Sequence, residues 1–231
     1  MVFDTGYLLL VALPAMALSF GASMLTKSAF NRYSRQRSRR GFTGAQAAQV
    51  MLDRAGVRGV QVVPTQGYLS DHYNPTNKTL ALSEAVYGST SIAAIGVACH
   101  EAGHAIQHAR SYAPLGLRSA LVPAFGIGSQ IGMWTMAFGA LFLGPTVILI
   151  GAFLFSAVVL FQLVTLPVEF DASARAKKLA VEYGLVGADE RRGMDKVLNA
   201  AALTYVAAAA SSILTLVYYL FRAGVLGGRN D

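Results

Sequence analysis

Long apolar stretches dominate the chain and alternate with two stretches that carry most of its charged side chains. Residues 119–168 include no Asp, Glu, Lys or Arg, a run of 50 residues. A helix needs about 20 apolar residues to cross a bilayer, so this run alone is long enough for two crossings. Gly144 and Pro145 interrupt the run and predict a tight turn between the two crossings. Four segments reach spanning length: 6–25, 121–142, 146–166 and 200–221.

The segment between the first two spans is predicted to form a helix, a small sheet and a second helix. Thr43 and Gln46 resemble a capping box and predict a helix that ends near Gly56. Strands are predicted at 60–63, 68–73 and 79–82. The Ser and Thr residues at 89–91 then predict the start of a helix over 92–107. We expect the strand at 79–82 to be an edge strand, with free backbone groups that an extended substrate could pair with.

Basic residues predict which segments face the cytoplasm. Eleven Lys and Arg lie in 27–118 and six more in 175–196, whereas the turn at Gly144 has none. Such residues gather on the cytoplasmic side of spans, so we expect the N- and C-termini outside. Basic residues follow the first span and do not precede it, which predicts an uncleaved anchor. The expected segments are the first anchor at 1–26, a cytoplasmic segment at 27–118, a transmembrane hairpin at 119–166, a second cytoplasmic segment at 167–199, and a fourth span with a short tail at 200–231.

Composition supports an integral membrane protein. Hydrophobic residues make up 54% of the 231 residues and charged residues only 13%, about half the charged fraction of a typical soluble domain. The net charge of +7 includes a basic cluster from Arg32 to Arg40, directly after a span. Anionic lipid headgroups are its nearest counter-charge, so we expect the bilayer, and no nucleic acid, as its partner. The single cysteine, Cys99, excludes an internal disulfide.

The helix predicted over 92–107 carries the sequence His100-Glu101-Ala102-Gly103-His104. Histidines four residues apart lie on one helical face, one turn apart, so both imidazoles can reach one zinc ion. Glu101 can approach the open position of the metal without ligating it. There it can take a proton from the attacking water and pass it to the leaving amine. The alternative is a surface helix that happens to carry two histidines, and the apolar turns before His100 argue against it.

Catalytic zinc needs a third protein ligand, and carboxylates are scarce in this chain. Glu169 and Asp171 come directly after the charge-free run. We favour Glu169 as the ligand and Asp171 as the residue that orients a ligating imidazole. The reverse assignment stays open, as does a helix-start carboxylate that binds backbone N–H groups. His108 lies about 12 Å from His100 along a straight helix, too far to share one ion with it.

A peptidase also needs a hydrogen-bonding or positive group near the oxyanion of its tetrahedral intermediate. The sequence does not rank the candidates, which are His72, Tyr73, Arg175, Tyr183 and Tyr205. Tyrosines near span ends more often anchor the chain at the membrane interface. A histidine beside a turn, such as His72, is more often solvated.

At these residues the chain resembles the YugP-type membrane zinc metallopeptidases of bacteria. The shared motifs are HEAGHAIQH from His100, DHYNP from Asp71, LSEAVY from Leu82 and EFDASAR from Glu169. The chain is more distantly similar to HtpX-type and CAAX prenyl proteases, whose third ligand is a glutamate on a later helix, and this implies Glu169. Those relatives usually have Asp or His four residues after the ligand, where this chain has Ser173. Ser173 therefore joins Asp171 and Arg175 as a residue expected to support the centre.

These features together predict a mostly α integral membrane protein: four transmembrane helices and a small α+β, zincin-like cytoplasmic part that carries the HExxH helix. We expect a zinc metalloendopeptidase of the bacterial inner membrane, with one Zn²⁺ per chain. It would hydrolyse membrane-associated or unfolded proteins on the cytoplasmic side. A homo-oligomer or a regulatory membrane partner is compatible with the sequence.

Two other functions are compatible with the same motif. One is a site-2-type intramembrane protease, but the apolar run before His100 is only about nine residues, too short to span a bilayer. The other is a zinc-stabilised membrane scaffold without turnover. Glu101 argues against the scaffold, because a purely structural zinc site needs no general base.

Overall fold

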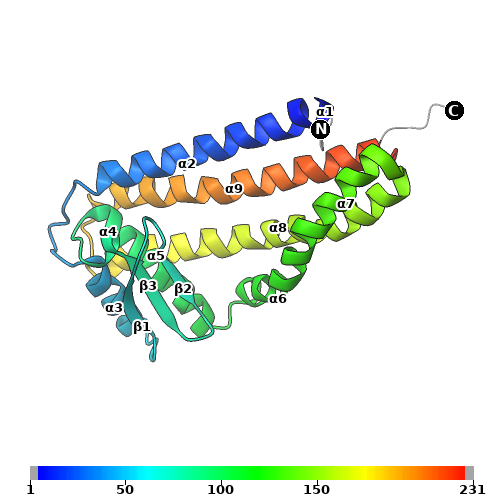
Figure 1. Cartoon of the computed structure of the whole chain (residues 1–231). Helices are drawn as coiled ribbons and strands as arrows, with labels where there is room; N and C mark the ends of the chain where they lie inside the picture. Colours follow the sequence, from blue (N-terminus) through cyan, green and yellow to red (C-terminus); the bar gives the residue numbers. More distant parts are fainter. Residues whose placement is uncertain (1–4, 227–231) are drawn as a thin grey trace. The chain divides into compact units, whose positions relative to one another are not determined.

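The computed structural model describes residues 5–226 and is mostly helical (Figure 1). It divides into two compact units, and each is assembled from separate stretches of the chain. The first unit holds the described parts of Met1–Ala22, Leu117–Leu166 and Thr204–Asp231, and the second holds Ser23–Gly116 and Pro167–Leu203. Both units are therefore discontinuous in sequence.

Within residues 5–226, four helices are long and apolar enough to cross a membrane, which confirms the four apolar segments predicted from the sequence. The first consists of α1 (Thr5–Tyr7), the π-helical turn η1 (Leu8–Ala12) and α2 (Leu13–Tyr33). The second consists of α6 (Ala113–Ile127), η2 (Gly128–Gly132), α7 (Met133–Phe138) and η3 (Gly139–Leu143). The other two are α8 (Pro145–Glu182) and α9 (Arg191–Arg222). Each helix is longer than its predicted span, because it continues into residues of the second unit.

Glycines allow the helical hairpin of the first unit to close. Gly144 has a φ of +88° and forms the predicted turn, a conformation that costs glycine little. A Cβ atom on Gly132 would lie 2.8 Å from the backbone nitrogen of Phe155, and one on Gly139 would lie 2.7 Å from that of Ile148. Both neighbours are backbone atoms that cannot move aside alone. Small residues at these positions therefore permit close packing of the two helices.

The second unit contains a three-stranded sheet of β1 (Gln61–Thr65), β2 (His72–Asn74) and β3 (Thr79–Ser83). β3 lies in the middle, parallel to β1 and antiparallel to β2 (Figure 1). The prediction of an edge strand here is therefore wrong, and the backbone of β3 is not free for an added strand. Four of its five residues are buried, as in a strand covered on both faces. β2 is shorter than the predicted strand at 68–73, because Leu69 within that range has a positive φ of 54°, which interrupts extended chain.

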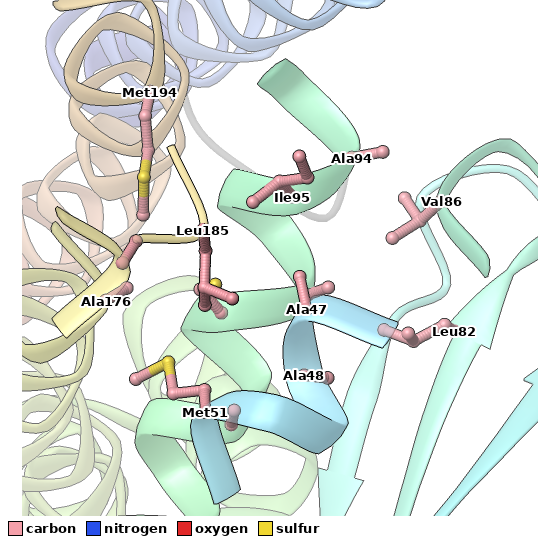
Figure 2. Close-up of a cluster of buried hydrophobic side chains, with 14 of the residues drawn as sticks. Ala47, Ala48, Met51, Leu82, Val86, Ala94, Ile95, Ala176, Leu185 and Met194 are labelled. Carbon is pink, nitrogen blue, oxygen red and sulfur yellow. The ribbon is translucent and has the colours of Figure 1, made fainter. Parts of the chain in front are cut away.

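The helix with the two histidines, α5 (Ile92–Ala109), lies at the centre of the second unit. Fourteen of its eighteen residues are buried, so it is not a surface helix. Beside it packs α3 (Gly44–Arg54), which opens with the predicted capping box of Thr43 and Gln46. Figure 2 shows the shared core, in which the α3 side chains Ala47 and Met51 lie beside α5. The short helix α4 (Glu84–Tyr87) connects the sheet to the start of α5.

A buried carboxylate fixes the chain segment that holds the start of α5. Glu190 accepts hydrogen bonds from the Ser38 hydroxyl (3.2 Å), the Arg39 backbone (2.8 Å) and the Gly187 backbone (2.7 Å). The same segment pairs with the start of α5, where the Ser38 N–H donates to the Thr90 carbonyl at 2.9 Å. Glu190 thereby ties the connection between α8 and α9 to the segment that positions the histidine helix.

The thiol of Cys99 on α5 is fully buried, and burial raises its pKa to about 12. Cysteine reacts as the thiolate, so we expect the native protein in detergent to resist maleimide labelling. The labelling rate should not rise between about pH 7 and about pH 9, where an ordinary cysteine ionises. Mass spectrometry of labelled protein measures this, with denatured protein as the positive control. Rapid labelling of the native protein would contradict the burial of this thiol.

Candidate metal centre

Three side chains from two helices meet at one point in the second unit. His100 and His104 come from α5, and Glu169 comes from α8. The Nε2 atoms of the two histidines are 3.2 Å apart, and Glu169 Oε2 lies 3.2 Å from His100 Nε2 and 3.5 Å from His104 Nε2. Glu169 is only 1% exposed and His104 is 8% exposed. This group could hold a metal ion.

The separations of the three donor atoms fit a single zinc ion. Imidazole nitrogens and carboxylate oxygens bind zinc at about 2.0–2.1 Å in tetrahedral geometry, which puts neighbouring donors about 3.3 Å apart. The three distances in this group bracket that value. Two imidazoles and one carboxylate are also a ligand set that zinc enzymes use, with a fourth position left open. The structure therefore brings together the three residues that the sequence predicts as ligands.

The electrostatics of the group favour a cation. Burial of the His104 imidazole opposes its protonation. The hydrogen bond to Glu169 and the charges of Glu101 and Glu169 outweigh burial, so the pKa of His104 is raised. The surroundings thus stabilise positive charge at this point, as expected where a metal ion binds between an imidazole and a carboxylate.

A glycine lets α5 and α8 approach closely enough to form this group. A Cβ atom on Gly103 would lie 2.7 Å from the carbonyl oxygen of Ala172 and 3.2 Å from its Cα. Gly103 directly precedes His104 in sequence, and Ala172 lies three residues after Glu169. Any side chain at this position would therefore separate the helices where the ligands converge. This role of Gly103 is not predictable from the sequence, because nothing local indicates which helix Gly103 faces.

The other predicted residues near the centre have distinct partners. Glu101 is 8% exposed, and its carboxylate makes no hydrogen bond within residues 5–226. The Ser173 hydroxyl lies 3.1 Å from His100 Nδ1. Asp171 bonds to Arg175, with 2.5 Å between the Arg175 Nε and Asp171 Oδ2. Within the described residues Asp171 has no hydrogen bond to either histidine, and it reaches them through another residue.

That residue is Gln107, which the sequence analysis did not propose for the site. It is fully buried, and its Oε1 lies 2.9 Å from His104 Nδ1. Its Nε2 donates to Asp171 Oδ2 at 2.8 Å and to the Val168 carbonyl at 2.8 Å. Two features of the sequence indicate Gln107 as a neighbour of His104. It is a polar side chain in an apolar helix, and its spacing of three residues puts Gln107 and His104 on one helical face.

The remaining candidates have partners elsewhere. His72 is exposed, and its Nδ1 lies 2.9 Å from the Ser70 carbonyl. Tyr73 hydrogen-bonds to His108, with 2.8 Å between its hydroxyl and Nδ1. The guanidinium of Arg54 lies over the ring of Tyr183. The last candidate, Tyr205, belongs to the first unit.

Apolar helices of membrane length and a His–His–Glu group with a buried carboxylate define a membrane protein with a candidate metal centre. Comparison with known proteins gives the family. The profile of a family described as "Putative neutral zinc metallopeptidase" matches residues 8–224, and the chain belongs to this family. It is also 44% identical over 221 residues to the "Putative membrane protease YugP" of Bacillus subtilis (strain 168). That match covers 96% of this chain and 97% of the relative.

The resemblance drawn from the sequence motifs is thereby confirmed. The family implies zinc and peptide or protein substrates, and the four apolar helices agree with a membrane protein. No solved structure matches the chain. The zincin-like character of the small α+β part therefore stays a prediction.

Replacing Gly103 tests the close approach of the two helices. We expect Gly103→Ala to weaken zinc binding by at least about tenfold, because the ligands would be pushed apart. Overpacking costs about 1–3 kcal/mol, against roughly 1 kcal/mol gained in helix propensity, so the melting temperature should fall slightly or stay level. Competition with a chromogenic chelator measures the zinc affinity.

The matched control is Gly116→Ala, since a Cβ atom there would meet nothing within 4 Å. This variant adds the same methyl group to a helix of the same unit and should bind zinc like the wild type. Equal zinc affinity in the two variants would contradict the role given to Gly103.

Proposed function

We propose that the protein is a membrane zinc endopeptidase in which His100, His104 and Glu169 hold one Zn²⁺ and Glu101 is the general base. One observation carries this proposal. The three donor atoms lie 3.2–3.5 Å apart, at the spacing of ligands around a single zinc ion. The family to which the chain belongs supports the same reaction class.

Zinc in this centre would supply a Lewis acid for the scissile carbonyl and for the attacking water. The protein supplies the proton transfers. Glu101 accepts a proton from the water as the water oxygen attacks the carbonyl carbon. Glu101 then donates that proton to the amine nitrogen as the carbon–nitrogen bond breaks. The carboxylate of Glu101 suits this role because no hydrogen bond within residues 5–226 occupies it.

The number of ligands favours an enzyme over a scaffold. Structural zinc sites are almost always closed by four protein ligands, whereas catalytic sites have three and an open position. Within the described part of the chain, the group consists of three residues. A glutamate beside the first histidine adds a base that a structural site would not need.

We further propose that the centre faces the cytoplasm and acts on membrane-associated or unfolded proteins. In this arrangement 27–118 and 167–199 are cytoplasmic and the N-terminus is outside. Two sequence features support it: the basic residues of both segments, and the position of Glu169 directly after the charge-free run. The relative named as a membrane protease is compatible with such substrates.

Removing the base tests catalysis directly. We expect Glu101→Gln to lower the rate of cleavage of an unfolded test protein by about 10²–10⁴-fold, because the amide cannot accept the proton. Purified protein in detergent is compared at matched zinc content. The control is Glu84→Gln, which makes the same chemical change at an exposed position and should cleave like the wild type.

A metal chelator should abolish cleavage by the wild type, and added zinc should restore it. Undiminished cleavage by Glu101→Gln with zinc bound would rule out this residue as the base. Absence of cleavage in every variant, with zinc present, would favour the scaffold.

Labelling of single engineered cysteines tests the orientation. Thr76 is exposed in the second unit, between β2 and β3. Thr146 is exposed just after the turn at Gly144. In intact cells, we expect a membrane-impermeant maleimide to label Thr146→Cys but not Thr76→Cys. Permeabilising the membrane should allow the maleimide to label Thr76→Cys. The opposite pattern would place the centre outside the cell and overturn the proposed orientation.

A further inference from the structure

The amide of Gln107 lies in a hydrogen-bond network that admits only one orientation. One end of the amide meets two oxygen atoms, the Val168 carbonyl and Asp171 Oδ2, each at 2.8 Å. Both can only accept hydrogen bonds, since the Asp171 carboxylate is paired with a guanidinium. The amide nitrogen, with its two hydrogens, must therefore occupy this end. A flipped amide would set an oxygen against two acceptors.

The orientation of Gln107 decides the tautomer of His104. With the nitrogen facing Val168 and Asp171, the amide oxygen faces His104 Nδ1 at 2.9 Å. An amide oxygen only accepts, so Nδ1 must carry the hydrogen. The lone pair of a neutral imidazole is then on Nε2, the atom that faces His100 and Glu169. A metal ion needs that lone pair.

The second histidine is supported differently. His100 Nδ1 lies 3.1 Å from the Ser173 hydroxyl. A hydroxyl can rotate to donate or to accept, so this contact fits either tautomer. Ser173 therefore helps to position the ring of His100 but does not choose which nitrogen carries the hydrogen. Of these two histidines, His104 is therefore the one whose tautomer the contacts impose.

We propose that Gln107 is a positioning residue for the metal centre: it holds His104 as the Nδ1–H tautomer, and Asp171 in turn holds Gln107. The inference rests on the proposed role of His104 as a ligand. Arg175 fixes Asp171 through Nε at 2.5 Å and Nη2 at 3.2 Å, and its guanidinium lies 5.7 Å from the ring centre of Tyr112. Asp171 thus acts on the imidazole through an intervening amide.

The test measures metal binding, so it does not depend on a substrate. We expect Gln107→Leu to bind zinc about 10–100-fold more weakly, because His104 Nδ1 loses its acceptor. With cobalt in place of zinc, the visible absorption bands should change in position or intensity as the ligand geometry loosens. Ile106→Ala is the matched control, since Ile106 is an equally buried neighbour outside this network. It should lower stability but leave zinc affinity and the cobalt spectrum close to wild type.

A second pair of variants covers the case in which Gln107→Leu does not fold. Gln107→Glu keeps an acceptor for His104 but sets a carboxylate against Asp171, so zinc affinity should fall. Adding Asp171→Asn replaces that repulsion with an amide donor and should recover at least about tenfold of the loss. Such recovery is a coupling between the two sites that general destabilisation does not produce.

The outcomes separate this inference from the proposed function. Wild-type zinc affinity in Gln107→Leu, or a loss no larger than that of Ile106→Ala, overturns the role of Gln107 and leaves the metal centre intact. Failure of Asp171→Asn to rescue Gln107→Glu also overturns it. If the wild-type chain binds no zinc, the proposed function fails, and this inference fails with it.

Discussion

The burial of the Glu169 carboxylate is the constraint on which the rest of the site depends. An ionised carboxylate buried without partners is strongly destabilised, so it must be paired or bind a metal. Two imidazoles from α5 face Glu169 at 3.2 and 3.5 Å and meet this need. The two rings reach Glu169 because α5 is buried along most of its length and meets α8 at Gly103. The packing of α5 against α8 in the second unit therefore also sets the arrangement of the three side chains at the centre.

The contacts around the centre form two layers. The atoms that face one another at the centre belong to His100 and His104 of α5 and to Glu169 of α8. Behind them, Gln107, Asp171 and Ser173 set how the rings are held, and these lie within a few residues of the ligands on the same two helices. Short sequence spacing on a rigid helix therefore fixes both layers together. The connection between α8 and α9 contributes indirectly, because Glu190 binds the segment of Ser38 and Arg39 that pairs with the start of α5.

Sequence reasoning succeeded where the signal is local and periodic. Apolar segments of spanning length predicted the four apolar helices, and Thr43 with Gln46 predicted the start of α3. Histidine spacing and the scarcity of carboxylates gave the three residues that meet. It failed where tertiary contacts decide the outcome. Nothing within β3 distinguishes a central from an edge strand, and the partner of Gln107 is an aspartate 64 residues away.

The order in which the ribosome makes the chain has a consequence for this centre. Both histidines are synthesised before the charge-free hairpin of 119–168, and Glu169 only after it. The second unit is likewise discontinuous, because its parts flank that hairpin. During translation the histidines exist without their carboxylate until two apolar helices have been made. A nascent chain therefore holds an incomplete His–His–Glu group until that hairpin and the start of the following segment have been synthesised.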